Sequence, residues 1–336
     1  MKREMVVAGK KIGDTHPTFI IAEAGSNHNV DINMAKKLID AASDAKADAV
    51  KFQIFKSNLL SSDKKEKYIL RDYEFKRSWI SKLDAYAKKK NIIFLATPFD
   101  LEAVDALDAI DIPAFKIASG DLTCTHLIEY IAKKKKPIFL SVGLGTIAEI
   151  KAAIETINQN GNKNVAILHC NVSYPTNPED VNLNVIKTLR DLFSNPIGFS
   201  DHTLGISVPV ASIALGACVI EKHFTLDKSL KGPDHFYALE PDELKKMVEA
   251  IRTVEKAFGS KEKFVTESEK ENLVGSRRSI YAKDKIKKGS IINSEMITTL
   301  RPCIGIEAKD FNLVVGKRTS RKINKGEALQ WNDLSD

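Results

Sequence analysis

The sequence predicts an α/β protein in which a parallel (β/α)8 barrel, the TIM-barrel architecture, is followed by a small β-rich domain. Three features of the 336-residue chain support this prediction. Eight short apolar runs alternate with longer amphipathic segments. The alternation ends at Phe258, and the remaining chain contains an internal repeat.

The eight apolar runs are the expected barrel strands. Each is too short for a helix and nearly continuous in apolar character, as in a parallel strand buried on both faces. They lie at residues 19–22, 49–52, 92–95, 114–117, 137–140, 165–168, 197–199 and 218–220. Intervening segments such as 34–45 and 244–258 carry apolar side chains at helical spacing. Eight such units match a closed barrel. An open doubly wound sheet is the alternative, but no glycine-rich phosphate loop follows the first run.

The chain is expected to divide at Phe258. Residues 1–258 would form the barrel, and the polar, charged residues 259–275 a linker. Within residues 276–336, Lys285-Ile-Lys-Lys-Gly289 recurs 37 residues later as Lys322-Ile-Asn-Lys-Gly326. Each copy predicts two strands joined by a Lys-Gly turn, so the two copies form one compact, pseudo-symmetric domain.

Composition excludes several classes of protein. Hydrophobic residues at 43% and charged residues at 28% are typical of a globular chain rather than a disordered one. Most of the net charge of +7 falls in residues 275–336, which hold 13 basic and 7 acidic side chains. We interpret this as a solvated face, with attraction of an anionic ligand as the alternative. No aromatic interleaving indicates nucleic-acid binding. No apolar run is long enough for a membrane span or a signal peptide, so we expect a cytoplasmic protein. The four scattered cysteines predict reduced thiols.

Polar side chains follow almost every apolar run. In chain order they are Glu23, Lys51, Gln53, Thr97, Lys116, Ser119, Ser141, Tyr174, Ser200, Asp201, His202, Glu221, Lys222 and His223. The carboxyl ends of barrel strands meet at one rim, so these side chains are expected to converge. Polar residues also cap strands where loops begin. Lysine or glutamate within an apolar run, however, is costly to bury unless it shares a polar pocket.

Two groups within this set suggest chemistry. His202 and His223 end neighbouring runs, and imidazoles completed by oxygen ligands suit Mn²⁺ or Mg²⁺, although a simple hydrogen-bonded pair fits equally well. Lys51 or Lys116 could form a Schiff base or could hold phosphate and carboxylate groups as fixed charges. The nearby hydroxyls favour a phosphorylated anion. These hydroxyls belong to Thr97, Ser119, Ser141 and Ser200.

Several motifs in order along the chain resemble the sialic acid synthase family. They are Glu23-Ala-Gly-Ser-Asn27-His28, Lys51-Phe-Gln53, Thr97-Pro98-Phe99, Phe115-Lys116-Ile-Ala-Ser119, Ser200-Asp201-His202-Thr203, Glu221-Lys222-His223-Phe224 and Gly232-Pro233-Asp234-His235. This family comprises the N-acetylneuraminate, legionaminate and pseudaminate synthases and related spore-coat polysaccharide enzymes. The end of the chain resembles the family's antifreeze-like (SAF) domain, with Arg301-Pro302 at the expected place.

The resemblance implies a carbon–carbon bond-forming transferase. Phosphoenolpyruvate would condense with an open-chain N-acylmannosamine-type sugar, giving a nine-carbon 2-keto sugar acid and inorganic phosphate. His202 and His223 would hold the divalent metal, Mn²⁺ or Mg²⁺, that polarises the sugar aldehyde. Glu23 would manage proton transfer as water adds to C2 of the former phosphoenolpyruvate.

The resemblance also assigns the binding residues. Those for phosphoenolpyruvate are Lys51, Thr97, Lys116, Ser119, Ser141 and Ser200. Those for the sugar are Gln53, Tyr174, Glu221, Asp234 and Arg301. Arg301 would come from the partner subunit of a domain-swapped homodimer. The sequence departs from the family at Val172, where some members have an asparagine that contacts phosphate. Asn171 or Ser173 could substitute after a local shift, and Asn171 is kept as the candidate phosphate contact.

Other functions remain open at this point. Within the family, Gly232-Pro233-Asp234 is closer to neuraminate or legionaminate synthases than to pseudaminate synthases, while pseudaminate and spore-coat enzymes stay as alternatives. Remoter hypotheses are a Schiff-base aldolase that uses Lys116 and a non-enzymatic glycan-binding protein.

Overall fold

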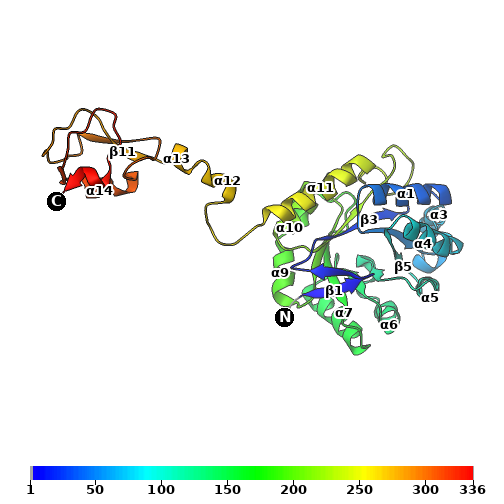
Figure 1. The fold of residues 1–336 in the computed structure, drawn as a ribbon. Coiled ribbons are helices and arrows are strands. Elements are labelled where there is room, and N and C mark those ends of the chain that lie inside the picture. Colours follow the sequence, from blue (N-terminus) through cyan, green and yellow to red (C-terminus); the bar gives the residue numbers. More distant parts are fainter. Residues whose placement is uncertain (1–2, 336) are drawn as a thin grey trace. The chain divides into compact units, whose positions relative to one another are not determined.

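The computed structural model describes residues 3–335 and divides the chain into two compact units, Met1–Phe258 and Gly259–Asp336 (Figure 1). In the first unit eight parallel strands close into a barrel in the order β10-β3-β4-β5-β6-β7-β8-β9. The strands are β3 (Phe19–Gly25), β4 (Ala49–Ile54), β5 (Ile93–Pro98), β6 (Phe115–Ile117), β7 (Ile138–Ser141), β8 (Val165–Cys170), β9 (Ile197–Asp201) and β10 (Val219–His223). Each predicted run coincides with one strand, so the predicted barrel is confirmed.

A helix that packs outside the barrel follows each strand (Figure 1). These helices are α1 (Ile32–Asp44), α4 (Ile80–Lys89), α5 (Leu101–Asp108), α6 (Thr125–Lys133), α7 (Ile147–Gln159), α9 (Val185–Leu192), α10 (Ser207–Ala214) and α11 (Pro241–Ala257). Three shorter helices, α2 (Ser57–Leu60), α3 (Lys64–Arg71) and α8 (Pro178–Val181), lie in the connections after β4 and β8. Helix α7 illustrates why the sequence folds this way. Thr146 and Glu149 form a capping box at its start, and Ile150, Ile154 and Ile157 share its buried face.

Alternation along the strands divides the barrel interior into an apolar and a polar half. Towards the amino ends of the strands, the interior is filled by one buried cluster that includes Phe19, Ile21, Ala49, Leu95, Ala114, Phe139, Ala166, Leu168 and Val219. Side chains two residues further along a strand point to the same face. They include Glu23, Lys51, Thr97, Lys116, Ser141, Cys170 and Glu221. The polar set therefore lies inside the carboxyl end of the barrel.

A hairpin that the sequence analysis did not predict closes the opposite end. Strands β1 (Glu4–Val7) and β2 (Lys10–Gly13) pair in antiparallel fashion around a turn with positive φ at Ala8 and Gly9. Met5, Val7 and Ile12 pack into the apolar cluster of the barrel interior. No helix within residues 3–335 is both long and apolar enough to cross a membrane.

The second unit is a small β-rich domain built on the repeat. Its strands are β11 (Ser279–Ala282), β12 (Ile297–Leu300), β13 (Arg318–Thr319) and β14 (Leu334–Ser335), and its short helices are α12 (Glu267–Lys270), α13 (Leu273–Ser276) and α14 (Phe311–Val314). Helix α12 and part of α13 fall within residues 259–275, which were expected to be a linker.

The two copies of the repeat contact each other through equivalent residues. Ile286 and Ile323, each the second residue of its copy, form an antiparallel bridge with both backbone hydrogen bonds, 2.9 and 3.0 Å long. Gly289 and Gly326 end the two copies with φ of 80° and 74°, a conformation that favours glycine. The pseudo-symmetry read from the sequence is thus present in the packing of the domain.

Candidate active site

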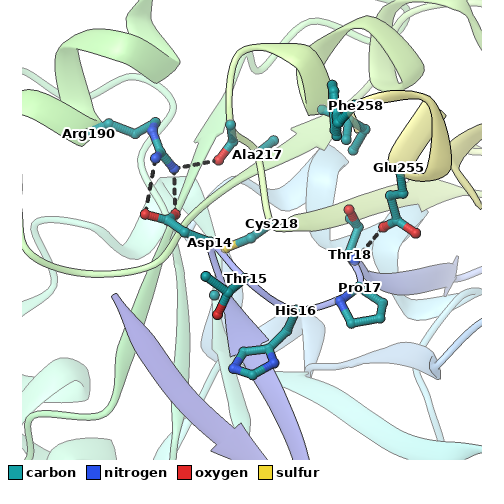
Figure 2. A pocket seen from close by; sticks show the side chains of 13 residues that line it. Asp14, Thr15, His16, Pro17, Thr18, Arg190, Ala217, Cys218, Glu255 and Phe258 are labelled. Carbon is teal, nitrogen blue, oxygen red and sulfur yellow. Dashed lines mark hydrogen bonds and ion pairs between the residues drawn. The ribbon is translucent and has the colours of Figure 1, made fainter. Parts of the chain in front are cut away.

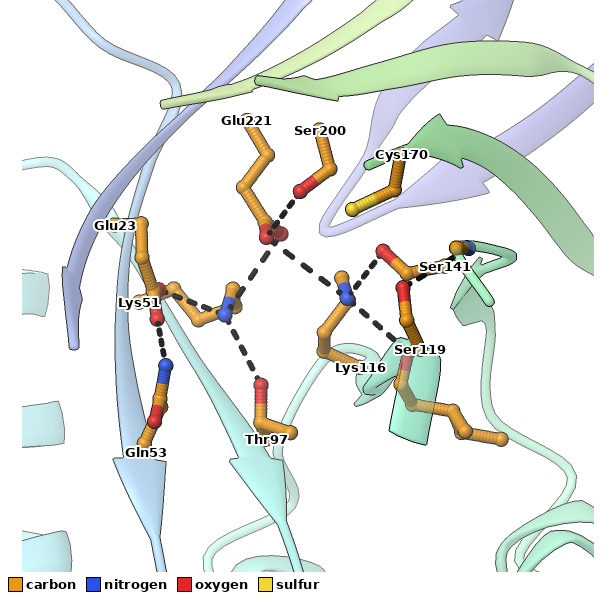
Figure 3. A network of polar contacts seen from close by, with 12 residues as sticks. Glu23, Lys51, Gln53, Thr97, Lys116, Ser119, Ser141, Cys170, Ser200 and Glu221 are labelled. Atoms are coloured by element: carbon orange, nitrogen blue, oxygen red, sulfur yellow. Dashed lines mark hydrogen bonds and ion pairs between the residues drawn. The ribbon is translucent and has the colours of Figure 1, made fainter. Parts of the chain in front are cut away.

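Most of the predicted site residues line one pocket inside the carboxyl end of the barrel (Figure 3). The pocket has a volume of about 50 Å³. Its lining includes Glu23, Lys51, Gln53, Thr97, Lys116, Ser119, Ser141, Tyr174, Ser200, His202, Glu221 and His223. These residues come from all eight barrel strands or the turns that follow them, as convergence at one rim requires.

Four charged side chains of alternating sign occupy the centre of the pocket (Figure 3). The Nζ atom of Lys51 lies 2.7 Å from Glu23 Oε2 and 3.7 Å from Glu221 Oε2. Lys116 Nζ lies 3.8 Å from Glu221 Oε1. All four residues are at least 95% buried. Because each buried charge has a partner of opposite sign, the cluster avoids the large cost of an isolated ion.

Hydroxyl groups complete the contacts of the two lysines. Lys51 Nζ donates to Thr97 Oγ1 at 3.0 Å, and Lys116 Nζ donates to Ser141 Oγ at 2.7 Å. Ser200 Oγ donates to Glu221 Oε1 at 3.1 Å. Two ammonium groups with adjacent hydroxyls are the donors that a phosphate or carboxylate group needs.

Burial and mutual charge set the protonation of the four ionisable groups. Burial raises the pKa of Glu23 to about 7, although the Lys51 ammonium group opposes this shift. Burial likewise raises the pKa of Glu221, but Lys116 and Lys51 outweigh it and the net pKa is lowered. Burial lowers the pKa of Lys116 despite Glu221. Glu23 is thus the carboxyl group that can take up or release a proton near neutral pH.

The two histidines lie side by side, with ring centroids 5.3 Å apart. Burial lowers the pKa of His202 to about 4 and of His223 to about 3, so both imidazoles are neutral at pH 7. His202 Nδ1 lies 2.7 Å from the Asn171 carbonyl oxygen, and His223 Nδ1 lies 3.2 Å from the Tyr237 hydroxyl. A neutral imidazole that donates from Nδ1 presents the lone pair of Nε2, which is the form that binds a metal.

The donor set fits a divalent metal that keeps open positions. Within residues 3–335, no group of three or more His, Cys, Asp or Glu side chains is arranged to hold a metal ion. If the predicted metal binds here, His202 and His223 would contribute the two imidazoles, and oxygen atoms of water or substrate would complete the shell. Oxygen-rich shells suit Mn²⁺ or Mg²⁺.

Not all of the residues predicted to bind the sugar line this pocket. The Tyr174 ring lies 4.2 Å from the His202 ring, and Gln53 Nε2 donates to Glu23 Oε1 at 3.0 Å. Asp234 Oδ2 is 3.9 Å from His223 Nδ1. Arg301 is exposed on the second unit, after β12. Its contribution to the site stays a prediction.

The side chain of Asn171 lies outside this pocket. Its Nδ2 donates to the Asp180 carbonyl oxygen at 3.2 Å, and the residue lines a different cavity with Thr146 and Asn184. Only its backbone carbonyl reaches the site, through His202. The phosphate contact of Asn171 stays a prediction.

Two residues with polar side chains, Cys170 and Tyr237, were missed in the sequence. Cys170 lines the pocket, and burial raises the pKa of its thiol. It lies two residues beyond inward-facing Leu168, so strand alternation would have identified it. Tyr237 contacts both His223 and Asp234, and its only signal is the three-residue spacing from Asp234.

A larger cavity, of about 400 Å³, lies at the other end of the barrel, before the amino ends of β3 and β10 (Figure 2). Its charged groups already have partners. Arg190 Nη1 contacts Asp14 Oδ1 at 2.7 Å and donates to the Gly216 carbonyl oxygen at 2.8 Å, while Glu255 accepts from the Thr18 backbone. The polar pocket at the carboxyl end is therefore the better candidate for chemistry.

Comparison with known proteins gives the family of the chain. A model of the NeuB family matches residues 38–263, and a model of the SAF domain matches residues 277–335. The N,N'-diacetyllegionaminic acid synthase of Campylobacter jejuni is 44% identical, covering 93% of this chain and 99% of that protein. A pseudaminic acid synthase of the same species is 38% identical, covering 94% and 96%. The crystal structure of the N-acetylneuraminic acid synthetase of Leptospira borgpetersenii in complex with citrate superposes with a TM-score of 0.77 at 38% identity, covering 81% of this chain and 95% of that one.

The family model covers more than half of the chain, and the relatives match over nearly its whole length. The resemblance read from the motifs is therefore confirmed: the chain belongs to the NeuB family and carries a SAF domain after its barrel.

Proposed function

We propose that this protein condenses phosphoenolpyruvate with an N-acylated amino sugar of the mannosamine type, forming a nine-carbon 2-keto sugar acid and releasing inorganic phosphate. The observation that carries the proposal is the pocket at the carboxyl end of the barrel. It holds two buried lysines with their hydroxyl partners (Figure 3), and a pair of neutral imidazoles lines the same pocket. The lysines and hydroxyls suit a phosphorylated anion, and the two imidazoles suit a Lewis-acidic cation.

In this proposal the lysines bind the anionic substrate. Lys51 and Lys116 offer two positive charges a short distance apart, linked through Glu221. The phosphate and carboxylate groups would take over hydrogen bonds that the lysines now make with Thr97 and Ser141. Buried, fixed donors of this kind stabilise charge without reorganisation during the reaction.

Glu23 is the proposed acid–base group. Its pKa near 7 lets it accept the proton of the water that adds to C2 of the former phosphoenolpyruvate. Gln53 and Lys51 hold the two carboxylate oxygens, so the group is fixed in orientation. A metal held by His202 and His223 would polarise the sugar aldehyde towards attack by C3 of phosphoenolpyruvate.

The proposed sugar is a diacetamido, 6-deoxy analogue of N-acetylmannosamine, as for a legionaminic acid synthase. The support is the 44% identity to the C. jejuni legionaminic acid synthase, against 38% for the pseudaminic acid synthase of that species. We also propose a homodimer in which Arg301 of one chain reaches the sugar bound by the other.

A phosphate-release assay tests the proposed reaction. Purified full-length protein receives phosphoenolpyruvate with either N-acetylmannosamine or its 2,4-diacetamido-6-deoxy analogue, with Mn²⁺, Mg²⁺ or excess chelator. We expect release only with a sugar and a metal, and a higher kcat/KM with the diacetamido sugar. Equal release in chelator would contradict the metal, and absence of release with both sugars would contradict the reaction.

A Schiff-base aldolase is the second candidate, because the lowered pKa of Lys116 is also what imine formation requires. Borohydride added to the protein with pyruvate would trap a covalent adduct on Lys116 if this function were correct. Mass spectrometry of the intact chain would then detect the adduct, and its absence favours the condensation.

A further inference from the structure

Tyr237 lies where the proposed metal and sugar positions meet. The side chain is 2% exposed, and its hydroxyl lies 3.0 Å from Asp234 Oδ1 and 3.2 Å from His223 Nδ1. Its ring packs against His223 and Tyr174, with centroids 5.3 and 5.7 Å away. The hydroxyl therefore touches one predicted metal ligand and one predicted sugar ligand at the same time.

The chemistry of the three groups fixes the direction of the hydrogen bonds. The Tyr237 hydroxyl has a single proton, and it donates that proton to Asp234 Oδ1. The hydroxyl oxygen is then left as an acceptor for His223 Nδ1. A proton on Nδ1 places the lone pair on Nε2, which is the state required of a metal ligand.

The partner imidazole is oriented by a different kind of group. His202 Nδ1 contacts a backbone carbonyl, that of Asn171, at 2.7 Å. Any residue at position 171 would supply this carbonyl, whereas the partner of His223 is a side chain. Of the two imidazoles, His223 is the one whose Nδ1 hydrogen bond a single substitution can remove without altering the backbone.

We propose that Tyr237 is a positioning residue that fixes the tautomer and ring orientation of His223 for a divalent metal and connects this ligand to Asp234. The inference rests on the metal dependence in the proposed function. Outer hydrogen-bonding partners of metal-bound histidines commonly change metal affinity by roughly 10- to 100-fold when they are removed. Tyr237 acts through His223 and does not itself bind the metal.

The substitution Tyr237→Phe distinguishes a positioning role of the hydroxyl from a packing role of the ring. Tyr237→Phe keeps the buried ring and its contacts with His223 and Tyr174, and removes only the hydroxyl. If the ring matters only for packing, the variant will bind metal as the unchanged protein does. If the hydroxyl orients His223, metal affinity will fall although the fold is preserved.

The direct test is Mn²⁺ binding by the full chain without substrate, measured from the electron paramagnetic resonance signal of free Mn²⁺. We expect the Kd of Tyr237→Phe to rise by roughly 10- to 100-fold. The matched control is Tyr86→Phe, which removes a hydroxyl that contacts Asp40 at 2.9 Å on the outer helices. Its Kd should equal that of the unchanged protein.

The connection to Asp234 is tested by a double-mutant cycle on the same Kd. Asp234→Asn should weaken Mn²⁺ binding in the unchanged background, and should have little further effect once Tyr237→Phe is present, because the two groups act in series. Equal effects of Asp234→Asn in both backgrounds would overturn the series arrangement.

The remaining outcomes separate this inference from the proposed function. Mn²⁺ bound equally well by the unchanged protein and Tyr237→Phe would refute the role of Tyr237 and leave the metal-dependent reaction intact. Failure of the unchanged protein to bind Mn²⁺ would refute the metal dependence itself and the inference with it.

Discussion

Replacement of Lys222 by methionine should destabilise the barrel strongly, although Lys222 faces away from the active site. The Lys222 ammonium group lies 2.5 Å from Asp201 Oδ2 and also donates to the Thr203 carbonyl oxygen. Side-chain exposure is 1% for the lysine and zero for the aspartate. The ion pair joins β9 to β10 on the outer face of the barrel.

The size of the effect follows from the charge that the substitution leaves behind. Methionine fills a similar volume but has no charge, so the Asp201 carboxyl group would remain buried without its counter-ion. Removal of one partner of a buried pair costs roughly 3–5 kcal/mol. For a barrel of this size, that free energy corresponds to a fall in Tm on the order of 10 °C.

Fluorescence can report the unfolding of the barrel separately from the second domain. The chain has two tryptophans, Trp79 in the barrel and Trp331 in the second unit, and they are 7% and 46% exposed. In a Trp331→Phe background, Trp79 alone reports urea unfolding. Lys90→Met is the matched control, because Lys90 pairs with Asp40 at 2.7 Å where the two side chains are 38% and 35% exposed. Such a surface pair contributes at most about 1 kcal/mol.

A second substitution distinguishes the unpaired charge from other causes. Asp201→Asn removes the charge while keeping an oxygen that can accept from the Thr203 backbone, now a contact of 2.9 Å. Lys222→Met with Asp201→Asn should therefore be more stable than Lys222→Met alone. A double variant no more stable than the single one, or a Lys222→Met effect no larger than that of Lys90→Met, would refute the reasoning.

Three further results are expected. Glu23→Gln should lower turnover by at least about 100-fold with an unchanged circular dichroism spectrum, because the amide cannot accept the proton; a normal rate would remove Glu23 from the mechanism. Burial lowers the pKa of His28 to about 4, so the unfolded chain binds a proton before the folded one does. The free energy of unfolding should then fall by up to about 3 kcal/mol as the pH drops from about 6.5 to 4, and His28→Leu should show a shallower decline in urea midpoints over that range. Arg301→Ala should mainly weaken sugar use, and mixing it with His223→Ala protein should restore part of the activity if sites are shared between chains; no recovery would contradict a shared site.

The barrel was predictable because its strands are buried on both faces. Such strands are continuous apolar runs, and all eight stood out from the amphipathic helices between them. The β1–β2 hairpin did not stand out, because only one face of it is buried. Its buried apolar residues are Met5, Val7 and Ile12, and three such residues in a short charged segment are too few to predict a pair of strands. Their role becomes clear only from the apolar cluster of the barrel interior, against which they pack.

Which residues line the pocket was also largely predictable from the sequence. The contacts that loop residues make with them were not. The position of a residue at a strand end determines the rim on which it lies, and this is a local property of the sequence. Contacts such as that of Tyr237 with His223, or the turn of the Asn171 side chain towards Asp180, depend on how loops fold back over the rim. No spacing in the sequence encodes those loop conformations.

The ends of β9 and β10 show how strand alternation divides stability from chemistry. Ser200 and His202 face the pocket, as do Glu221 and His223, while Asp201 and Lys222 between them face the helices and form the ion pair. The same short segments thus carry the predicted metal ligands on one face and the bond that holds the two strands together on the other. In the sequence these six residues look alike, as polar side chains at strand ends. The two-residue period of a strand separates the four side chains that would contact substrate from the two that form the ion pair. That ion pair joins the strands that carry the two imidazoles, whose ring centroids lie 5.3 Å apart.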